Sequence, residues 1–175
     1  GKKLGIHAFG QVGRNVARIA KGFGMEVYAF DPYCPAEAIE AEGVKPITDI
    51  NEMYSTCQYI SLHIPATPET KKSINYNLLK QMPKGAVLIN TARKEVIDEE
   101  ELVKLMEDRA DFKYISDIKP DNASVFAEKF EGRYFFTPKK MGAQTAEANI
   151  NAGIAAAKQS VGFLKEGIDK FKVNK

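Results

Sequence analysis

Short apolar runs alternate along the chain with longer amphipathic stretches, and Gly, Pro, Asn and Asp residues separate them. Six of the short runs carry β-branched or aromatic residues and end at a turn residue, which is typical of strands. The predicted strands cover residues 3–9, 26–30, 59–63, 86–90, 113–117 and 134–137, and residues 44–46 form a weaker seventh.

Helical spacing of apolar residues fills most of the intervals between these strands. It predicts helices over residues 11–22, 75–81 and 98–108, and a long final helix from about residue 145 to residue 171. The cluster Asp98-Glu99-Glu100-Glu101 favours a first helical turn, where the positive end of the helix dipole lies. Residues 122–132 show no clear pattern. The alternation of strands and helices predicts an α/β fold, a doubly wound parallel sheet with helices on both faces.

Composition and charge exclude several classes of protein. The length of 175 residues suits one domain, and 44% hydrophobic and 27% charged residues are ordinary values for a globular chain. A net charge of +2 from 25 basic and 23 acidic residues gives no reason to expect nucleic-acid binding. No uncharged apolar run approaches the roughly 18 to 20 residues of a membrane span, and the start of the chain lacks the apolar stretch of a signal peptide. We therefore expect a soluble, cytoplasmic protein that binds no membrane.

The two cysteines, Cys34 and Cys57, lie far from any second Cys or His at metal-ligand spacing. We therefore expect ordinary reduced thiols and no metal site.

The segment GIHAFGQVGRNVA, residues 5–17, is a strand that runs into a helix through a turn of small residues. It resembles the G-x-G-x-x-G fingerprint of dinucleotide-binding folds, with Gly10 at the close approach to the diphosphate and Gly13 at the contact between helix and strand. Ala8 replaces the first glycine and can make the turn only with a negative φ, so we expect a negative φ there. The backbone N–H groups of Gln11 and Val12 would receive the diphosphate oxygens. The alternative is a purely structural turn.

Asp31 strengthens the nucleotide interpretation, because it follows Gly10 by 21 positions and ends the second predicted strand. An acidic residue at that place accepts hydrogen bonds from the adenosine ribose and repels the extra phosphate of NADP, so the expected cofactor is NAD. The alternative is a simple Asp-Pro turn with Pro32.

Two further segments, SLHIPATPET at residues 61–70 and MPKGAVLINTAR at residues 82–93, complete a larger pattern. Together with the turn they resemble the signatures of the D-isomer-specific 2-hydroxyacid dehydrogenases, over residues 3–145. The resemblance implies a Rossmann-like NAD-binding domain, NAD-dependent oxidoreductase activity on a small 2-hydroxy acid, and a homodimer. It implies cofactor contacts at Gly10, Gln11, Val12, Gly13, Asp31, His63, Ile64, Pro65, Thr70, Thr91, Ala92, Asp117 and Gly142.

The same resemblance assigns Arg93 to the carboxylate of the substrate. The chemistry agrees, because a planar guanidinium offers two parallel donors that fix the orientation of a carboxylate. Lys94 stands where most members of the family have Gly, so its backbone conformation bears on the resemblance.

Two family residues that work together in catalysis are absent here. The family carries a Glu five residues after the Asp that corresponds to Asp117, and here Asp121 is only a candidate substitute. The catalytic His of the family is replaced by lysine, and alignment from the flanking residues places either Lys139 or Lys140 at its position. The alternative is a solvated basic turn in a non-catalytic relative.

A lysine can perform the proton transfer in principle, because hydride transfer from a hydroxyl carbon needs a group that takes the hydroxyl proton and returns it in reverse. An ordinary lysine is protonated at neutral pH, so it is a ready acid in the reducing direction. One group of 3-phosphoglycerate dehydrogenases has Lys at this position, and this chain resembles that group.

The resemblance also implies that a second, substrate-binding domain is missing from residues 1–175, so that this chain is an excised dinucleotide-binding domain with little or no turnover by itself. Three functions remain open: a 3-phosphoglycerate dehydrogenase of serine biosynthesis, a hydroxypyruvate or glyoxylate reductase, and a non-catalytic NAD-sensing scaffold. The final helix has an apolar face that would pack on the sheet or contact a second subunit. That face consists of Ile150, Ile154, Ala157, Val161, Leu164 and Ile168.

Overall fold

The computed structural model describes residues 1–140, 142, 145–170 and 172. The chain divides into two compact units, Gly1–Lys139 and Lys140–Lys175. The expectation of one dinucleotide-binding domain over residues 1–175 therefore stays a prediction, and each unit is described by itself. Of the helices in the described ranges, none is both long and apolar enough to span a bilayer.

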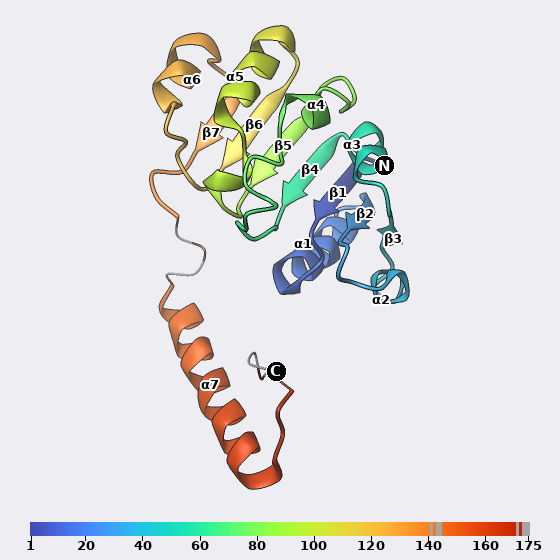
Figure 1. The fold of residues 1–175 in the computed structure, drawn as a ribbon, viewed down its shortest axis with the longest axis vertical. Coiled ribbons are helices and arrows are strands. Elements are labelled where there is room, and N and C mark those ends of the chain that lie inside the picture. Colours follow the sequence, from blue (N-terminus) through green and yellow to red (C-terminus); the bar gives the residue numbers. More distant parts are fainter. Residues whose placement is uncertain (141, 143–144, 171, 173–175) are drawn as a thin grey trace. The chain divides into compact units, whose positions relative to one another are not determined.

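The first unit is built on a seven-stranded sheet in the order β3-β2-β1-β4-β5-β6-β7, and every pair of neighbours is parallel (Figure 1). This arrangement confirms the predicted doubly wound α/β fold. The strands are β1 Lys3–His7, β2 Glu26–Phe30, β3 Lys45–Pro46, β4 Tyr59–Leu62, β5 Val87–Asn90, β6 Lys113–Ser116 and β7 Tyr134–Phe136.

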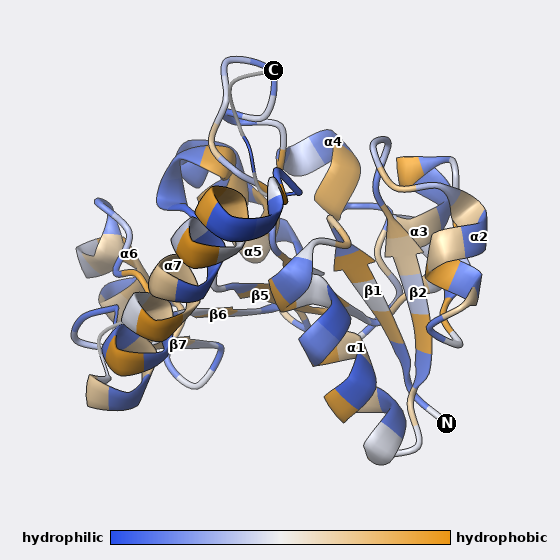
Figure 2. Cartoon of the chain, turned by 90° about the horizontal axis from the view of Figure 1, so that it is seen from below, coloured by the Kyte–Doolittle hydropathy of each residue, from blue (hydrophilic) through white to orange (hydrophobic). Residues whose placement is uncertain are grey.

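Helices connect the strands through crossovers and cover both faces of the sheet. The helices are α1 Gln11–Gly22, α2 Ala36–Glu40, α3 Ile50–Thr56, α4 Tyr76–Leu79, the 3₁₀ helix η1 Lys94–Val96, α5 Glu99–Asp108 and α6 Ala123–Lys129, and the second unit holds α7 Ala146–Glu166. The two clusters of buried side chains place α1 and α2 on one face and α3 to α6 on the other, as the right-handed crossover rule predicts for this strand order. Figure 2 shows α1 and α4 on opposite sides of the sheet.

Two groups of buried side chains fill the first unit. One joins α1 and α2 to β1 and β2, and its members include Leu4, Ile6, Ala17, Val27 and Ile39. The other joins α3 to α6 to strands β4 to β6, and its members include Met53, Tyr54, Leu88, Leu105 and Phe126. Because both faces of β1 and β4 are covered, these central strands are buried almost throughout.

The turn after β1 differs from the prediction in one respect. Ala8 has a φ of +78°, so the expectation of a negative φ there is wrong. The Ala8 N–H donates to the carbonyl of Phe30 at 2.9 Å, and the Phe9 N–H donates to Asp31 Oδ2 at 2.8 Å. These two bonds to the end of β2 fix the turn in a conformation that an L side chain rarely adopts. Strand β1 accordingly ends at His7 and not at the predicted residue 9.

The final helix also ends earlier than predicted, at Glu166 and not at residue 171, which lies outside the described residues. Thr145 caps its first turn by accepting from the Ala148 N–H at 3.0 Å. Gly167 adopts a left-handed φ of +67°, and the N–H of Ile168 then bonds back to the carbonyl of Gly162. This arrangement is a Schellman cap, which ends a helix.

Candidate functional site

The carboxyl ends of the parallel strands meet at one edge of the sheet, where ligands bind in open α/β folds. At this edge α1 begins at Gln11 with Gly10 as its N-cap, and its first turn contains neither a side-chain cap nor an acidic residue. Gln11 and Val12 are exposed, and a Cβ added to Gly10 would meet no atom within 4 Å. The helix start therefore offers free backbone N–H groups beside open space, which suits an anionic group.

Gly13 lies where α1 contacts the end of β1, the role that the fingerprint assigns to its last glycine. A Cβ at this position would lie 2.4 Å from the Ala8 carbonyl oxygen and 3.1 Å from Ile6 Cγ2. Only glycine lets α1 approach the end of β1 this closely.

Asp31 is held by backbone donors at the end of β2. Its Oδ2 accepts from the Phe9 N–H at 2.8 Å, and its Oδ1 accepts from the Tyr33 N–H at 2.9 Å. A carboxylate oxygen has two lone pairs, so each oxygen can accept a further hydrogen bond.

A hollow of about 270 Å³ adjoins Asp31, between the end of β2 and the residues that follow β3. Its walls are mostly apolar, as a flat heteroaromatic ring requires. They include Phe30, Pro32, Ile39, Pro46 and Ile47, together with Cys34.

Two histidines lie at the carboxyl ends of the central strands β1 and β4. His7 is buried, and its Nδ1 lies 3.1 Å from the hydroxyl of Tyr54. Burial lowers the pKa of His7 to about 4, against the opposing effect of the nearby Asp31 carboxylate. His63 Nε2 lies 3.0 Å from Ser61 Oγ, and burial also lowers the pKa of His63 to about 4. Both rings are neutral at neutral pH.

The loop after β4 is closed by the side chain of Thr70. Its hydroxyl donates to the carbonyl of Pro65 at 2.6 Å and accepts from the Thr67 N–H at 2.7 Å. Ile64 is buried and Pro65 is exposed in this loop. Thr70 therefore shapes the segment that follows His63.

Arg93 follows β5, and the fully buried side chain of Asn90 organises its loop. Asn90 Oδ1 accepts from the Ala92 N–H, and Asn90 Nδ2 donates to the Arg93 carbonyl, both at 3.0 Å. The Arg93 side chain is exposed, and its Nη1 donates to the carbonyl of Ala92 at 2.9 Å. The guanidinium is thus accessible beside the edge of the sheet.

Thr91 and Asp117 lie at the ends of the neighbouring strands β5 and β6. Thr91 is exposed, and the Asp117 N–H donates to the carbonyl of Asn90 at 3.2 Å. Ser116 Oγ donates to the same carbonyl at 3.0 Å. Asn90 therefore joins the end of β6 to the Arg93 loop.

Lys94 begins η1, and the described non-glycine residues with a positive φ are Ala8 and Lys72, so Lys94 needs no strained backbone. Its Nζ lies 2.7 and 2.9 Å from the two carboxylate oxygens of Asp121, which raises the pKa of Lys94. The carboxylate of Asp121 therefore forms an ion pair with Lys94.

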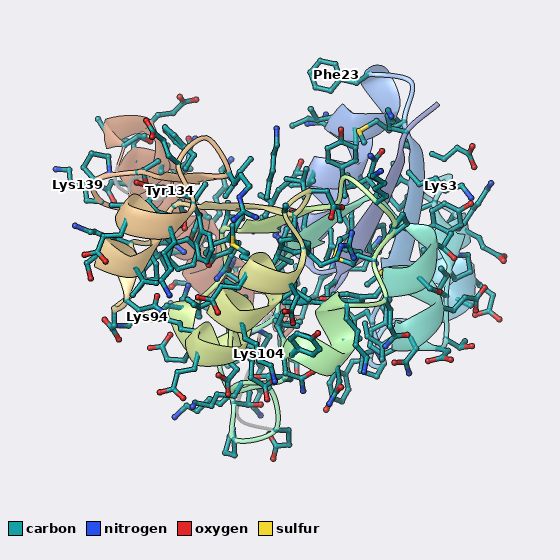
Figure 3. All side chains as sticks on the ribbon, turned by 90° about the horizontal axis from the view of Figure 1, so that it is seen from above. Lys3, Phe23, Lys94, Lys104, Tyr134 and Lys139 are labelled. Atoms are coloured by element: carbon teal, nitrogen blue, oxygen red, sulfur yellow. The ribbon has the colours of Figure 1, made fainter. Side chains whose placement is uncertain are left out.

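The two candidate proton carriers belong to different units. Lys139 follows β7, is exposed and points away from the first unit, and the Thr137 hydroxyl donates to its carbonyl at 3.2 Å (Figure 3). Lys140 begins the second unit, which also contains the exposed Gly142. Lys140 and Gly142 therefore belong to a different unit from the remaining predicted site residues.

The comparisons with known proteins agree with this geometry. The family model of the D-isomer specific 2-hydroxyacid dehydrogenase NAD binding domain matches residues 1–128. The chain belongs to this family. This membership confirms the NAD-binding, Rossmann-like domain that the sequence predicted.

Individual relatives extend the match over nearly the whole chain. The D-3-phosphoglycerate dehydrogenase of Methanocaldococcus jannaschii is 35% identical over 99% of this chain and 33% of its own length. The glyoxylate reductase of Thermococcus litoralis is 33% identical over 100% of this chain and 53% of its own length. The solved NAD⁺-bound 3-phosphoglycerate dehydrogenase of Entamoeba histolytica is 47% identical, with a TM-score of 0.85, over 99% of this chain and 55% of that one. The chain thus spans between a third and about half of these relatives.

The first unit gathers most of the predicted site residues along one edge of its sheet. These are Gly10, Gln11, Val12, Gly13, Asp31, His63, Ile64, Pro65, Thr70, Thr91, Ala92, Arg93 and Asp117. Sequence reasoning missed Asn90 as a residue that positions the Arg93 loop. Its place at the end of an apolar strand was a usable signal, because a buried amide there must find hydrogen-bond partners.

Proposed function

We propose that this chain is the NAD-binding domain of a 3-phosphoglycerate dehydrogenase, within a longer enzyme that transfers a hydride between NAD and 3-phosphoglycerate or 3-phosphohydroxypyruvate in serine biosynthesis. The observation that carries the proposal is the exposed Arg93 guanidinium, whose loop backbone is held by Asn90 at the edge where the nucleotide turn and Asp31 also lie. The match to 3-phosphoglycerate dehydrogenases along 99% of the chain supports it.

The residues of the first unit fit the cofactor. Gly10 leaves room for a diphosphate, and the N–H groups of Gln11 and Val12 would bind its oxygens. Asp31 would accept from the ribose hydroxyls, and the apolar hollow beside it would hold the adenine ring. When bound, NAD supplies the hydride acceptor.

The chain's own contribution to the chemistry is to orient the substrate and to move a proton. Arg93 would bind the substrate carboxylate through two parallel N–H donors, and the buried Asn90 would hold its loop in place. Lys139 or Lys140 would take the hydroxyl proton and, in the reducing direction, donate it as a charged ammonium. The substrate domain that would close this site lies outside residues 1–175 in our proposal.

A glyoxylate or hydroxypyruvate reductase is the second candidate, favoured by the match to the glyoxylate reductase of Thermococcus litoralis. The same Arg93 and lysine would serve an unphosphorylated 2-oxo acid. The two candidates differ in whether a substrate phosphate is bound.

The first experiment measures NADH oxidation by the intact enzyme that contains this domain, with 3-phosphohydroxypyruvate, hydroxypyruvate, glyoxylate and pyruvate in parallel. We expect turnover only with the phosphorylated acid. Of the two single variants Lys139→Ala and Lys140→Ala, we expect one to lose turnover and the other to keep it. Turnover with an unphosphorylated acid alone would favour the reductase. Cofactor binding without turnover of any of the four would leave a non-catalytic NAD-sensing scaffold.

The role of Gly10 gives a binding test on the chain itself. Because a Cβ at Gly10 would meet no protein atom within 4 Å, Gly10→Val should cost little stability beyond its weaker N-cap preference but should fill the space proposed for the diphosphate. We expect NADH affinity to fall about tenfold, the loss of roughly one charge-assisted hydrogen bond, and Gly10→Ala to have a smaller effect. Fluorescence titration measures the affinity, and urea unfolding checks stability. Unchanged affinity in Gly10→Val would place the diphosphate elsewhere.

The homodimer and the cytoplasmic location expected from the sequence also belong to this proposal. Exposed apolar side chains on α7 support an association surface, and so do Ile115 and Phe135 on the first unit's sheet. The exposed apolar side chains of the α7 unit are Ile150, Ile154, Val161, Phe163, Leu164 and Ile168.

A further inference from the structure

The guanidinium of Arg14, near the start of α1, lies in the same corner of the first unit as Asp31. Its Cζ is 4.9 Å from the centroid of the Phe9 ring, and its Nη2 donates to Cys34 Sγ at 3.4 Å. Both partners also bond to Asp31 through their backbones: the Phe9 N–H donates to Asp31 Oδ2 at 2.8 Å, and the Cys34 N–H donates to the Asp31 carbonyl at 3.3 Å. Arg14 therefore flanks the carboxylate proposed to bind the adenosine ribose.

A second carboxylate, that of Glu42, is paired with this guanidinium. Arg14 Nη1 lies 3.1 Å from Glu42 Oε1, and the two side chains are 30% and 48% exposed. The corner thus holds two carboxylates and one guanidinium, with one net negative charge. Without the charge of Glu42, the net charge of these three groups would be zero.

The backbone at Glu42 has its own attachment to α1, because Lys21 Nζ donates to the Glu42 carbonyl oxygen. The turn that carries Glu42 is therefore held against the helix by a contact that a side-chain substitution leaves in place. For this reason Glu42→Gln can remove the charge without releasing the segment.

Arginine is well suited to bind a phosphate, because its planar guanidinium presents parallel N–H donors that match two phosphate oxygens. NADP differs from NAD by a phosphate on the adenosine ribose, and a nearby arginine commonly accommodates that group. Arg14 is such a cation beside the proposed ribose site, and its guanidinium is already paired with the carboxylate of Glu42.

We propose that Glu42, by neutralising Arg14, acts together with Asp31 to keep this domain selective for NAD over NADP. Arg14 and Glu42 are then specificity-determining residues, and Arg14 is a latent site for a ribose phosphate. The inference rests on the proposed function, because it requires the adenosine ribose to bind at Asp31.

The test is a fluorescence titration of the 175-residue chain with NADH and with NADPH, which differ only in the ribose phosphate. We expect Glu42→Gln to raise the affinity for NADPH relative to NADH about fivefold, the upper end of the range for an exposed ion pair. Glu40→Gln, on α2, removes the same charge two residues away and should change the ratio less than twofold. In the double variant Arg14→Gln/Glu42→Gln the ratio should return to that of the unsubstituted chain, and high salt should reduce the gain.

The possible results distinguish failure of this inference from failure of the proposed cofactor site. An unchanged ratio in Glu42→Gln, or an equal change in both affinities, would give the Arg14–Glu42 pair a purely structural role and overturn the inference while NAD binding stands. The same gain in Glu40→Gln would assign the effect to net charge alone and also overturn it. Failure of the unsubstituted chain to bind either nucleotide would overturn the proposed cofactor site, and the inference with it.

Discussion

Lowering the pH from 7 to 4 is expected to destabilise the first unit by several kcal/mol. The cause is the pair of neutral histidines, His7 and His63, whose pKa values burial lowers from 6.5 to about 4. The unfolded chain binds protons at these rings below about pH 6.5, whereas the folded chain does so only near pH 4, so stability falls as the pH decreases through this window. At 1.36 kcal/mol for each unit of pKa difference, each histidine contributes at most about 3 kcal/mol.

Urea unfolding at pH 7, 6, 5 and 4 measures this loss. His7→Gln and His63→Gln remove one titrating ring each, and each variant should show a smaller fall in unfolding free energy between pH 6.5 and pH 4 than the unsubstituted chain. The pKa of the Asp111 carboxyl is held far below its usual range by the hydrogen bond from Arg109, so its titration falls below this window. Equal stability of the unsubstituted chain at pH 7 and pH 4.5 would contradict the explanation.

Gly13→Ala should be the most damaging single substitution in the nucleotide turn. The new Cβ would lie 2.4 Å from the Ala8 carbonyl oxygen, a backbone atom that the Phe30 and Asp31 hydrogen bonds hold in place. The helix must then move away from the strand, and we expect a loss of about 3 kcal/mol of unfolding free energy, the upper part of the range for overpacking.

Gly22→Ala, at the end of the same helix, is the matched control. A Cβ there meets no atom within 4 Å, so the substitution should stabilise the chain by about 0.5 to 1 kcal/mol through helix propensity. Thermal or urea unfolding compares the two variants. If Gly13→Ala were as stable as Gly22→Ala, the close approach of α1 to Ala8 would not exist in solution.

The sequence predicted the sheet and its nucleotide turn because those features depend on local patterns. Six apolar runs became strands, with small differences at their ends, and the glycine spacing located the start of α1. The short helices α2, α3 and α6 were not predicted, because five to seven residues contain too little periodicity to be distinguished from loop.

The remaining differences come from contacts between distant segments. The positive φ of Ala8 depends on hydrogen bonds to residues at the end of β2, which no local pattern encodes. The role of Asn90 depends on the neighbouring strand and loop that its side chain joins. The pairing of Lys94 with Asp121 spans 27 positions, and it gave Asp121 a partner that the motif comparison did not suggest.

The strand order has a consequence for how this domain can change over evolution. Strands β1 to β3 lie on one side of β4 and carry the proposed adenosine site, whereas β5 to β7 lie on the other side and lead into the segments that carry Arg93 and Lys139. In the proposed function, the groups that contact the adenosine therefore come from residues before position 50, and the groups that bind the acid and move its proton come from residues after position 90. Substitutions in the first stretch could then alter the preference between NAD and NADP while the groups proposed to contact the acid are inherited unchanged.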